Sequence, residues 1–237
     1  MIGRLCVVEL RKTVDTVAGF VLLVVGAVLA GVFGGGGMLY RPGASLSDIA
    51  QLAGVPGGTL ATVMAILLVT SERSHHTALV TYVMTPRREL VVLAKAVAAA
   101  ALGVVVVLLA VLAALLIMPV GSLVTSQAAS WTVEPGQLTW WAVGTVAAAL
   151  SGFALGLVLG NAPAAITIVL VWPMLSSMLG RVPGLDTVLP WLDISAMGAL
   201  SDGATAVEVG RTVTGLLAWV VVPAAVGVWR LVRSEVR

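Results

Sequence analysis

The sequence has 237 residues, of which 59% are hydrophobic and 10% are charged, and its mean hydropathy is +1.10. A soluble domain usually carries about 25% charged residues and could bury only part of this apolar surface. The composition therefore argues against a water-soluble enzyme or binding module and predicts a membrane protein. The formal net charge of +2 is too small to indicate a polyanionic partner, so we expect no binding to nucleic acid.

The first predicted element is an amphipathic helix at residues 1–16. Its apolar side chains, such as Leu5 and Leu10, recur at helical spacing on one face, and its charged side chains lie on another. This pattern is typical of a helix in the cytoplasmic interface before the first membrane span, although a simple extension of that span is an alternative. The charged residues of this interfacial helix are Arg4, Glu9, Arg11, Lys12 and Asp15.

Six runs of mostly apolar residues follow, and each approaches the length of about 20 residues that crosses the hydrocarbon core as a helix. They are Val17–Phe33, Leu52–Thr70, Leu90–Val120, Thr139–Leu159, Ala162–Gly180 and Thr212–Leu231. The third run is overlong, which predicts that it tilts or projects into the cytoplasm at its Lys95 end. The expected fold is all-α, a polytopic integral membrane bundle of six transmembrane helices in one domain of residues 1–237.

Two of the connections between these runs have contrasting compositions. Gly34–Gly58 is rich in glycine and proline, which predicts an external loop between the first two spans. The fourth and fifth runs are separated only by Gly160-Asn161, which predicts a tight turn before Pro163, because proline suits the first turn of a helix.

Residues 181–211 form a longer connection before the last run. The middle of this segment is too apolar for a free loop and too short to cross the membrane. We therefore expect an external segment of short re-entrant or interfacial helices, broken at Pro190 and Gly198.

Basic residues predict the orientation, since they concentrate in the cytoplasmic segments of membrane proteins. With both termini in the cytoplasm, ten of the 13 basic residues fall on the cytoplasmic side and three fall outside. The ten are Arg4, Arg11, Lys12, Arg73, Arg87, Arg88, Lys95, Arg230, Arg233 and Arg237. The three are Arg41, Arg181 and Arg211.

The fourth run carries small residues at a strict spacing of four. They are Gly144, Ala148, Gly152, Gly156 and Gly160. A ridge of this kind lets another helix approach closely, because helix association within lipid depends on packing. Packing within the chain is favoured over an interface between subunits.

The most informative connection is the segment 71–90, between the second and third runs. Residues 77–85 can form a short amphipathic helix, and Pro86 ends it. Its apolar side carries Leu79, Val80, Val83 and Met84. Such a helix on the cytoplasmic face offers an apolar side to a partner, and an interfacial loop anchored by arginines is the alternative.

The segment also carries several short motifs in a characteristic order. They are Glu72-Arg73, Thr77, Thr85-Pro86-Arg87-Arg88 and Ala94-Lys95. This order resembles the first cytoplasmic loop of ABC transporter permeases of the type 2 class. Glu9-Leu10-Arg11-Lys12 resembles the amphipathic N-terminal helix of that family, and Leu189-Pro190-Trp191 resembles a step in its last external segment. One departure is His75-His76, where many members have a basic residue followed by glycine.

The resemblance implies a transmembrane permease subunit of an ATP-driven exporter in the bacterial plasma membrane. The loop would be a coupling helix that docks on a separate ATPase subunit, present in two copies, with a second permease chain completing a homo- or heterodimer. The coupling residues it implies are Glu72, Arg73, Thr77, Leu79, Val83, Met84, Pro86, Arg87 and Arg88.

The chain itself is not expected to be an enzyme or to bind a cofactor. A phosphate-binding loop needs a lysine in a G-x-x-x-x-G-K-[ST] pattern, but neither Lys12 nor Lys95 follows a glycine. ATP and Mg would therefore bind to the partner. With one cysteine, Cys6, and two adjacent histidines, the chain offers no expected metal site.

Two further functional classes stay open at this point. A secondary transporter or channel subunit without an ATPase partner is the main alternative, although proton-driven carriers normally use a carboxylate deep in the membrane, and the runs contain none. A non-transporting membrane scaffold is another. The lack of buried charge in the runs favours a hydrophobic or amphipathic substrate such as a drug, lipid or peptide.

Overall fold

The computed structural model describes residues 11, 16–41, 43–74, 88–125, 130–193 and 205–233. Within these ranges the regular structure is helical, apart from an isolated bridge between Ser45 and Ser130. Six of the helices are long and apolar enough to cross a membrane. The chain is therefore a multi-pass helical membrane protein, and the predicted all-α fold with six candidate spans is confirmed.

The helices follow the predicted runs closely and extend several of them. The first five candidate spans are α2 (Val17–Tyr40), α3 (Leu46–Ser74), α5 (Arg88–Thr125), α6 (Pro135–Leu159) and α7 (Ala162–Leu179). The sixth is built from α9 (Ala206–Leu216), the π-helical turn η3 (Leu217–Val221) and α10 (Val222–Arg233). Two short elements precede it, α8 (Leu185–Val188) and the 3₁₀ turn η1 (Leu189–Trp191).

The predicted external loop at Gly34–Gly58 is wrong, because α2 and α3 continue through it and leave only residues 41–45 as a connection. Glycine is tolerated in these helices because it allows close approach. A Cβ added at Gly34 or at Gly37 would lie 2.6 Å from a side-chain atom of a neighbouring helix. Pro56 stands inside α3, as prolines do in membrane helices when neighbouring groups satisfy the backbone.

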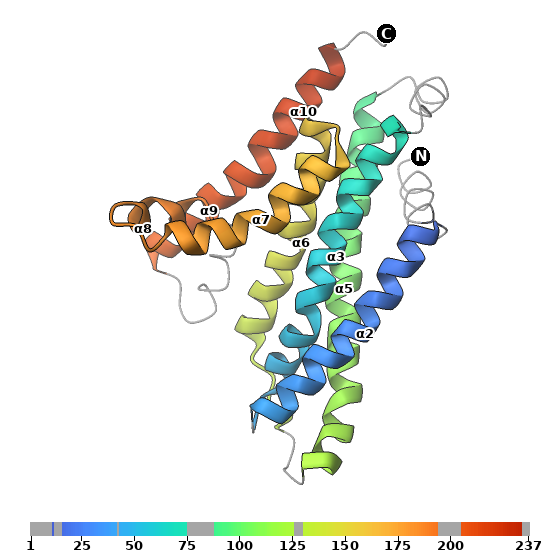
Figure 1. The fold of residues 1–237 in the computed structure, drawn as a ribbon, viewed down its shortest axis with the longest axis vertical. Coiled ribbons are helices and arrows are strands. Elements are labelled where there is room, and N and C mark those ends of the chain that lie inside the picture. Colours follow the sequence, from blue (N-terminus) through green and yellow to red (C-terminus); the bar gives the residue numbers. More distant parts are fainter. Residues whose placement is uncertain are drawn as a thin grey trace.

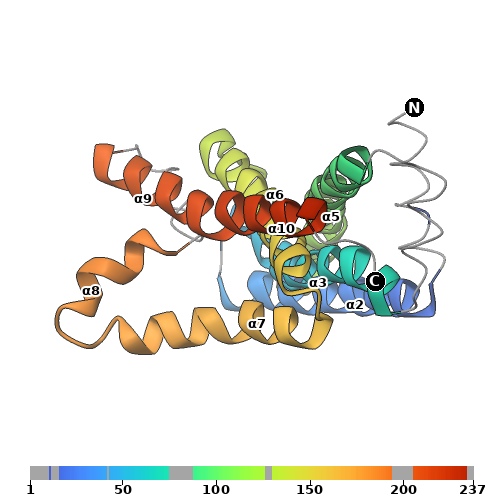
Figure 2. The same cartoon turned by 90° about the horizontal axis from the view of Figure 1, so that it is seen from above.

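The core lies around α3 and α6, which stand side by side with α5 and α2 (Figure 1). Of the residues in the most apolar stretch of a helix, 56% are buried in α3 and in α6, whereas 6% are buried in α7. Buried apolar side chains form one cluster among α2, α3 and α5 and a second among α3, α5 and α6. Figure 2 shows α7 and α9 extending away from this four-helix core toward α8.

Hydrogen bonds fasten the start of α3 to the start of α6 at one end of the bundle. The backbone N–H of Leu46 donates to the Thr132 carbonyl at 3.1 Å, and the N–H of Glu134 donates to Ser47 Oγ at 2.9 Å. Gln137 Nε2 adds a bond of 3.2 Å to an Asp48 carboxylate oxygen. These bonds make this end a well-connected part of the structure.

The segment predicted as re-entrant helices at 181–211 divides into several parts. Pro190 lies in η1, directly after α8 ends, as predicted for a helix break. From Ala206 onward the chain is helical and leads without interruption into the last span, so the predicted segment extended too far. Gly198 lies outside the described residues.

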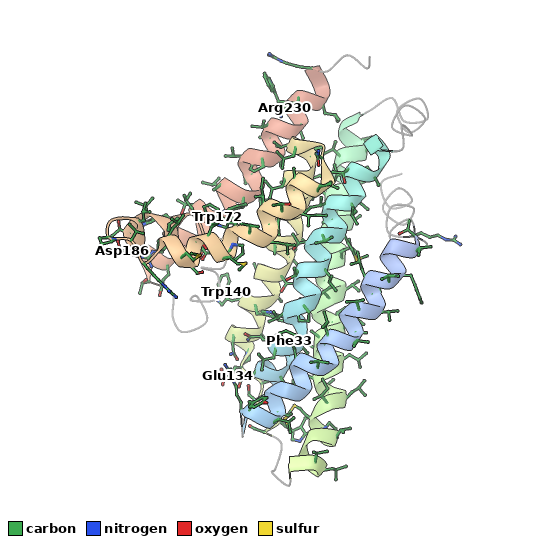
Figure 3. The ribbon with its side chains drawn as sticks, in the orientation of Figure 1. Phe33, Glu134, Trp140, Trp172, Asp186 and Arg230 are labelled. Atoms are coloured by element: carbon green, nitrogen blue, oxygen red, sulfur yellow. The ribbon has the colours of Figure 1, made fainter. Side chains whose placement is uncertain are left out.

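Two side-chain bonds attach η1 to the last span. Thr214 Oγ1 donates to the Trp191 carbonyl at 2.8 Å, and Trp219 Nε1 donates to the Leu192 carbonyl at 2.6 Å. Trp219 also contacts Trp172 of α7, with ring centroids 5.1 Å apart. Helix α7 and the last span are thereby joined on the side of the bundle marked by Trp172 and Asp186 in Figure 3.

Candidate functional site at the junction of α3 and α5

The predicted coupling segment connects the end of α3 to the start of α5. Glu72 and Arg73 lie in the last turn of α3, and Arg88 is the first residue of α5. The other predicted coupling residues lie outside the described residues: Thr77, Leu79, Val83, Met84, Pro86 and Arg87. Of the predicted interfacial helix, Arg11 is described and is helical and exposed, whereas Arg4, Glu9 and Lys12 lie outside the described residues.

The ends of several helices meet at this end of the bundle. Figure 1 shows the end of α3, the start of α5, the end of α10 and the turn between α6 and α7 gathered there. The starts of α3 and α6 lie at the opposite end, where Glu134 is labelled in Figure 3. A displacement of the segment between α3 and α5 would therefore act first on helix ends that are far from the bonded starts of α3 and α6.

The burial of Lys95 at this junction was not predicted from the sequence. Among the residues that the structure describes, Lys95 is the one charged side chain that is buried, with 6% of its surface exposed. Its ammonium group donates a hydrogen bond of 2.9 Å to the backbone carbonyl of Leu68 in α3. Lys95 therefore packs inside the bundle, near the start of the overlong helix α5.

Several residues close to Lys95 in the two helices are apolar and buried. On its own helix Val91 and Ala98, four residues before it and three after it, are buried, and Leu68 is buried on α3. A charged group in such an environment is costly unless its donors are bonded. The bond to the Leu68 carbonyl therefore lowers the free-energy cost of burying the Lys95 charge.

A second cross-helix bond at this end involves α10. Arg230 Nη1 donates to the Val158 carbonyl at 3.1 Å, next to the end of α6, where helical carbonyls lack partners. Arg233 lies over the Trp229 ring at 4.7 Å from its centroid, a cation–π contact. Figure 3 shows Arg230 close to this end of the bundle.

The glycine ridge of α6 contacts α3 within the chain. A Cβ added at Gly152 would lie 2.5 Å from the Thr62 carbonyl oxygen, and one at Gly156 would lie 3.2 Å from the Ile66 carbonyl oxygen. Gly160 ends the helix with a φ of 63°, and its N–H donates to the Gly156 carbonyl. The predicted tight turn before Pro163 is confirmed, because the Asn161 side chain caps the start of α7.

In the described part of the chain, no three His, Cys, Asp or Glu side chains come together in a way that could hold a metal ion. The sequence did hold one signal for Lys95: it is a single lysine within a long apolar run, and intramembrane charges mark functional positions by default. Comparison with protein-family models and with curated proteins finds no match to this chain.

Proposed function

We propose that the chain is the transmembrane permease subunit of an ATP-driven exporter, working with two copies of a separate cytoplasmic ATPase subunit and with a second permease chain. The observation that carries this proposal is the ordered set of motifs from Glu72-Arg73 to Ala94-Lys95. These motifs flank and occupy the junction of α3 and α5, where a coupling segment is expected. Six candidate spans are few for a complete pathway, which supports assembly with a second permease chain.

The mechanism follows from where this segment is attached. Closure of the nucleotide-loaded ATPase subunits would push the segment 75–87, and the adjoining ends of α3 and α5 would move with it. For the substrate pathway to open to one side of the membrane and then to the other, the helices need two alternative arrangements. Nucleotide binding to the ATPase subunits must shift the equilibrium between these arrangements. The bonded starts of α3 and α6 provide a fixed base for such a tilt. The mostly apolar spans favour a hydrophobic or amphipathic substrate, although the expected lack of buried charge is wrong at Lys95.

We propose that the end of the bundle with the α3–α5 junction faces the cytoplasm of a bacterial cell. Arg73, Arg88, Arg230 and Arg233 belong to helix ends at this side, whereas Arg41 follows α2 at the other. Basic residues favour the cytoplasmic side. This uneven distribution supports placing both termini in the cytoplasm.

The orientation can be tested by cysteine labelling in a Cys6→Ser background. Val133→Cys and Asp186→Cys are expected to react with an impermeant maleimide in intact cells, and Thr77→Cys only after permeabilisation. Val133 is half exposed in the connection before α6, so its reactivity reports the side of the membrane. Labelling of Val133→Cys only after permeabilisation would reverse the proposed orientation.

The function itself is tested by purifying the tagged chain in mild detergent and identifying the proteins that accompany it. We expect an ATPase subunit with a phosphate-binding loop in the eluate, in equal number to the permease chains. An eluate with no such subunit, together with transport driven by an ion gradient, would favour a secondary transporter.

A further inference from the structure

We infer that Lys95 is a positioning residue that holds the ends of α3 and α5 together, so that a displacement of the segment 75–87 moves both helices as one unit. The observation that carries this inference is the 2.9 Å bond from the Lys95 ammonium group to the Leu68 carbonyl. The inference rests on the proposed function and identifies the residue that transmits the displacement.

The bond lies at the same depth in both helices. Lys95 is seven residues beyond the start of α5, and Leu68 is six residues before the end of α3. At about 1.5 Å per residue, each is about 10 Å from the helix end that adjoins the segment 75–87. The bond therefore joins α3 and α5 at about the same distance from these two helix ends.

The acceptor is a backbone atom, which makes the bond sensitive to the position of the helix. A carbonyl oxygen cannot move relative to the α3 axis as a side-chain carboxylate can, so the bond fixes the axial position of α3 against Lys95. A hydrogen bond is electrostatically stronger in a surrounding of low polarity than in water.

The contacts next to this bond are of a different kind. Val69 of α3 and Ala99 of α5 belong to one apolar cluster, in which attraction depends on area and has no direction. A hydrogen bond, by contrast, weakens steeply when its geometry is lost. Lys95 therefore supplies a directional contact between α3 and α5 at this depth.

Lys95→Met tests the inference, because methionine has a similar length, no charge and no donor, and adapts to irregular packing. The intrahelical bond of the Leu68 carbonyl stays in place, so we expect normal insertion and normal association with the ATPase subunit. We expect stimulation of ATP hydrolysis to fall about tenfold, within the 5–150-fold range typical of coupling between sites. Lys95→Arg, which keeps charge and donors, should restore most of it. Leu93→Met on the exposed face of α5 is the matched control.

A second measurement follows the helices directly and needs no ATPase. Spin labels at Ser71→Cys in α3 and Leu93→Cys in α5, both exposed positions, report the separation of the two helix ends in a Cys6→Ser background. We expect a single narrow distance distribution for the native Lys95 and a broader one for Lys95→Met.

The outcomes separate this inference from the proposed function. An unchanged distance distribution or full stimulation in Lys95→Met would overturn the inference while the native complex stays active. Failure of Lys95→Met to insert or to form monodisperse protein would show a structural role only and would also overturn it. Absence of any ATPase subunit from the purified native protein would instead overturn the proposed function. It would also overturn the role of Lys95 in transmitting the displacement, whatever distances the spin labels report.

Discussion

Replacing Gly152 with alanine is expected to lower the thermal stability of the protein more than any other glycine-to-alanine change on α6. The new Cβ would lie 2.5 Å from the Thr62 carbonyl oxygen and 2.7 Å from its Cγ2 atom. A backbone oxygen cannot turn aside as a flexible side chain can, so α3 and α6 must separate along the most buried contact of the bundle. Overpacking of this kind typically costs about 1–3 kcal/mol, and we expect Gly152→Ala at the upper end of that range.

Two matched variants make this prediction specific. A Cβ at Gly156 would lie 3.2 Å from the Ile66 carbonyl oxygen, so Gly156→Ala should cost less. Gly31 in α2 has nothing within 4 Å of the new atom, and Gly31→Ala should be neutral or slightly stabilising because alanine favours helix. Melting in detergent should rank the native protein and Gly31→Ala above Gly156→Ala, with Gly152→Ala lowest. Equal melting temperatures for all four would contradict the α3–α6 contact.

Replacing Val83 with aspartate is expected to abolish association with the ATPase subunit. The sequence places Val83 with Leu79 and Met84 on the apolar side of the predicted coupling helix. An unpaired charge in an apolar contact costs several kcal/mol, and about 4 kcal/mol corresponds to a thousandfold loss of affinity. The measurement is the amount of ATPase subunit that elutes with the tagged chain.

The matched control for Val83→Asp is Val133→Asp. It introduces the same charge at an exposed valine in the connection before α6, at the opposite end of the bundle. Both variants should reach the membrane at the native level, and only Val83→Asp should elute alone. Native-level association of Val83→Asp would show that the segment 71–90 does not bind the ATPase subunit.

The number and positions of the helices could be predicted from the sequence because the spans are set by the thickness of the hydrocarbon core. The residues at which the helices begin and end could not be predicted. Gly34 and Gly37 belong to α2 because they allow close contact with neighbouring helices, and Pro56 is accommodated inside α3. Rules derived from soluble proteins assign glycine and proline to loops, and those rules fail where the helix is buried among other helices.

The sequence predicted where the candidate site lies in the chain but not the contacts that its residues make. The motifs around residues 71–90 pointed to the connection of the second and third spans, which is the α3–α5 junction. The role of Lys95 was not predictable, because its acceptor is a backbone carbonyl on another helix and no residue type marks such an atom. The same limit applies to the bonds that join the starts of α3 and α6, which depend on the tertiary contact.

We propose that this chain transports its substrate with the free energy of ATP hydrolysed by a bound partner. The most direct measurement is ATP hydrolysis by the protein purified from its native membrane and returned to lipid nanodiscs. We expect ATP hydrolysis that co-purifies with the native chain and is missing from the Val83→Asp preparation. A native preparation without ATP hydrolysis and without an ATPase subunit would contradict it.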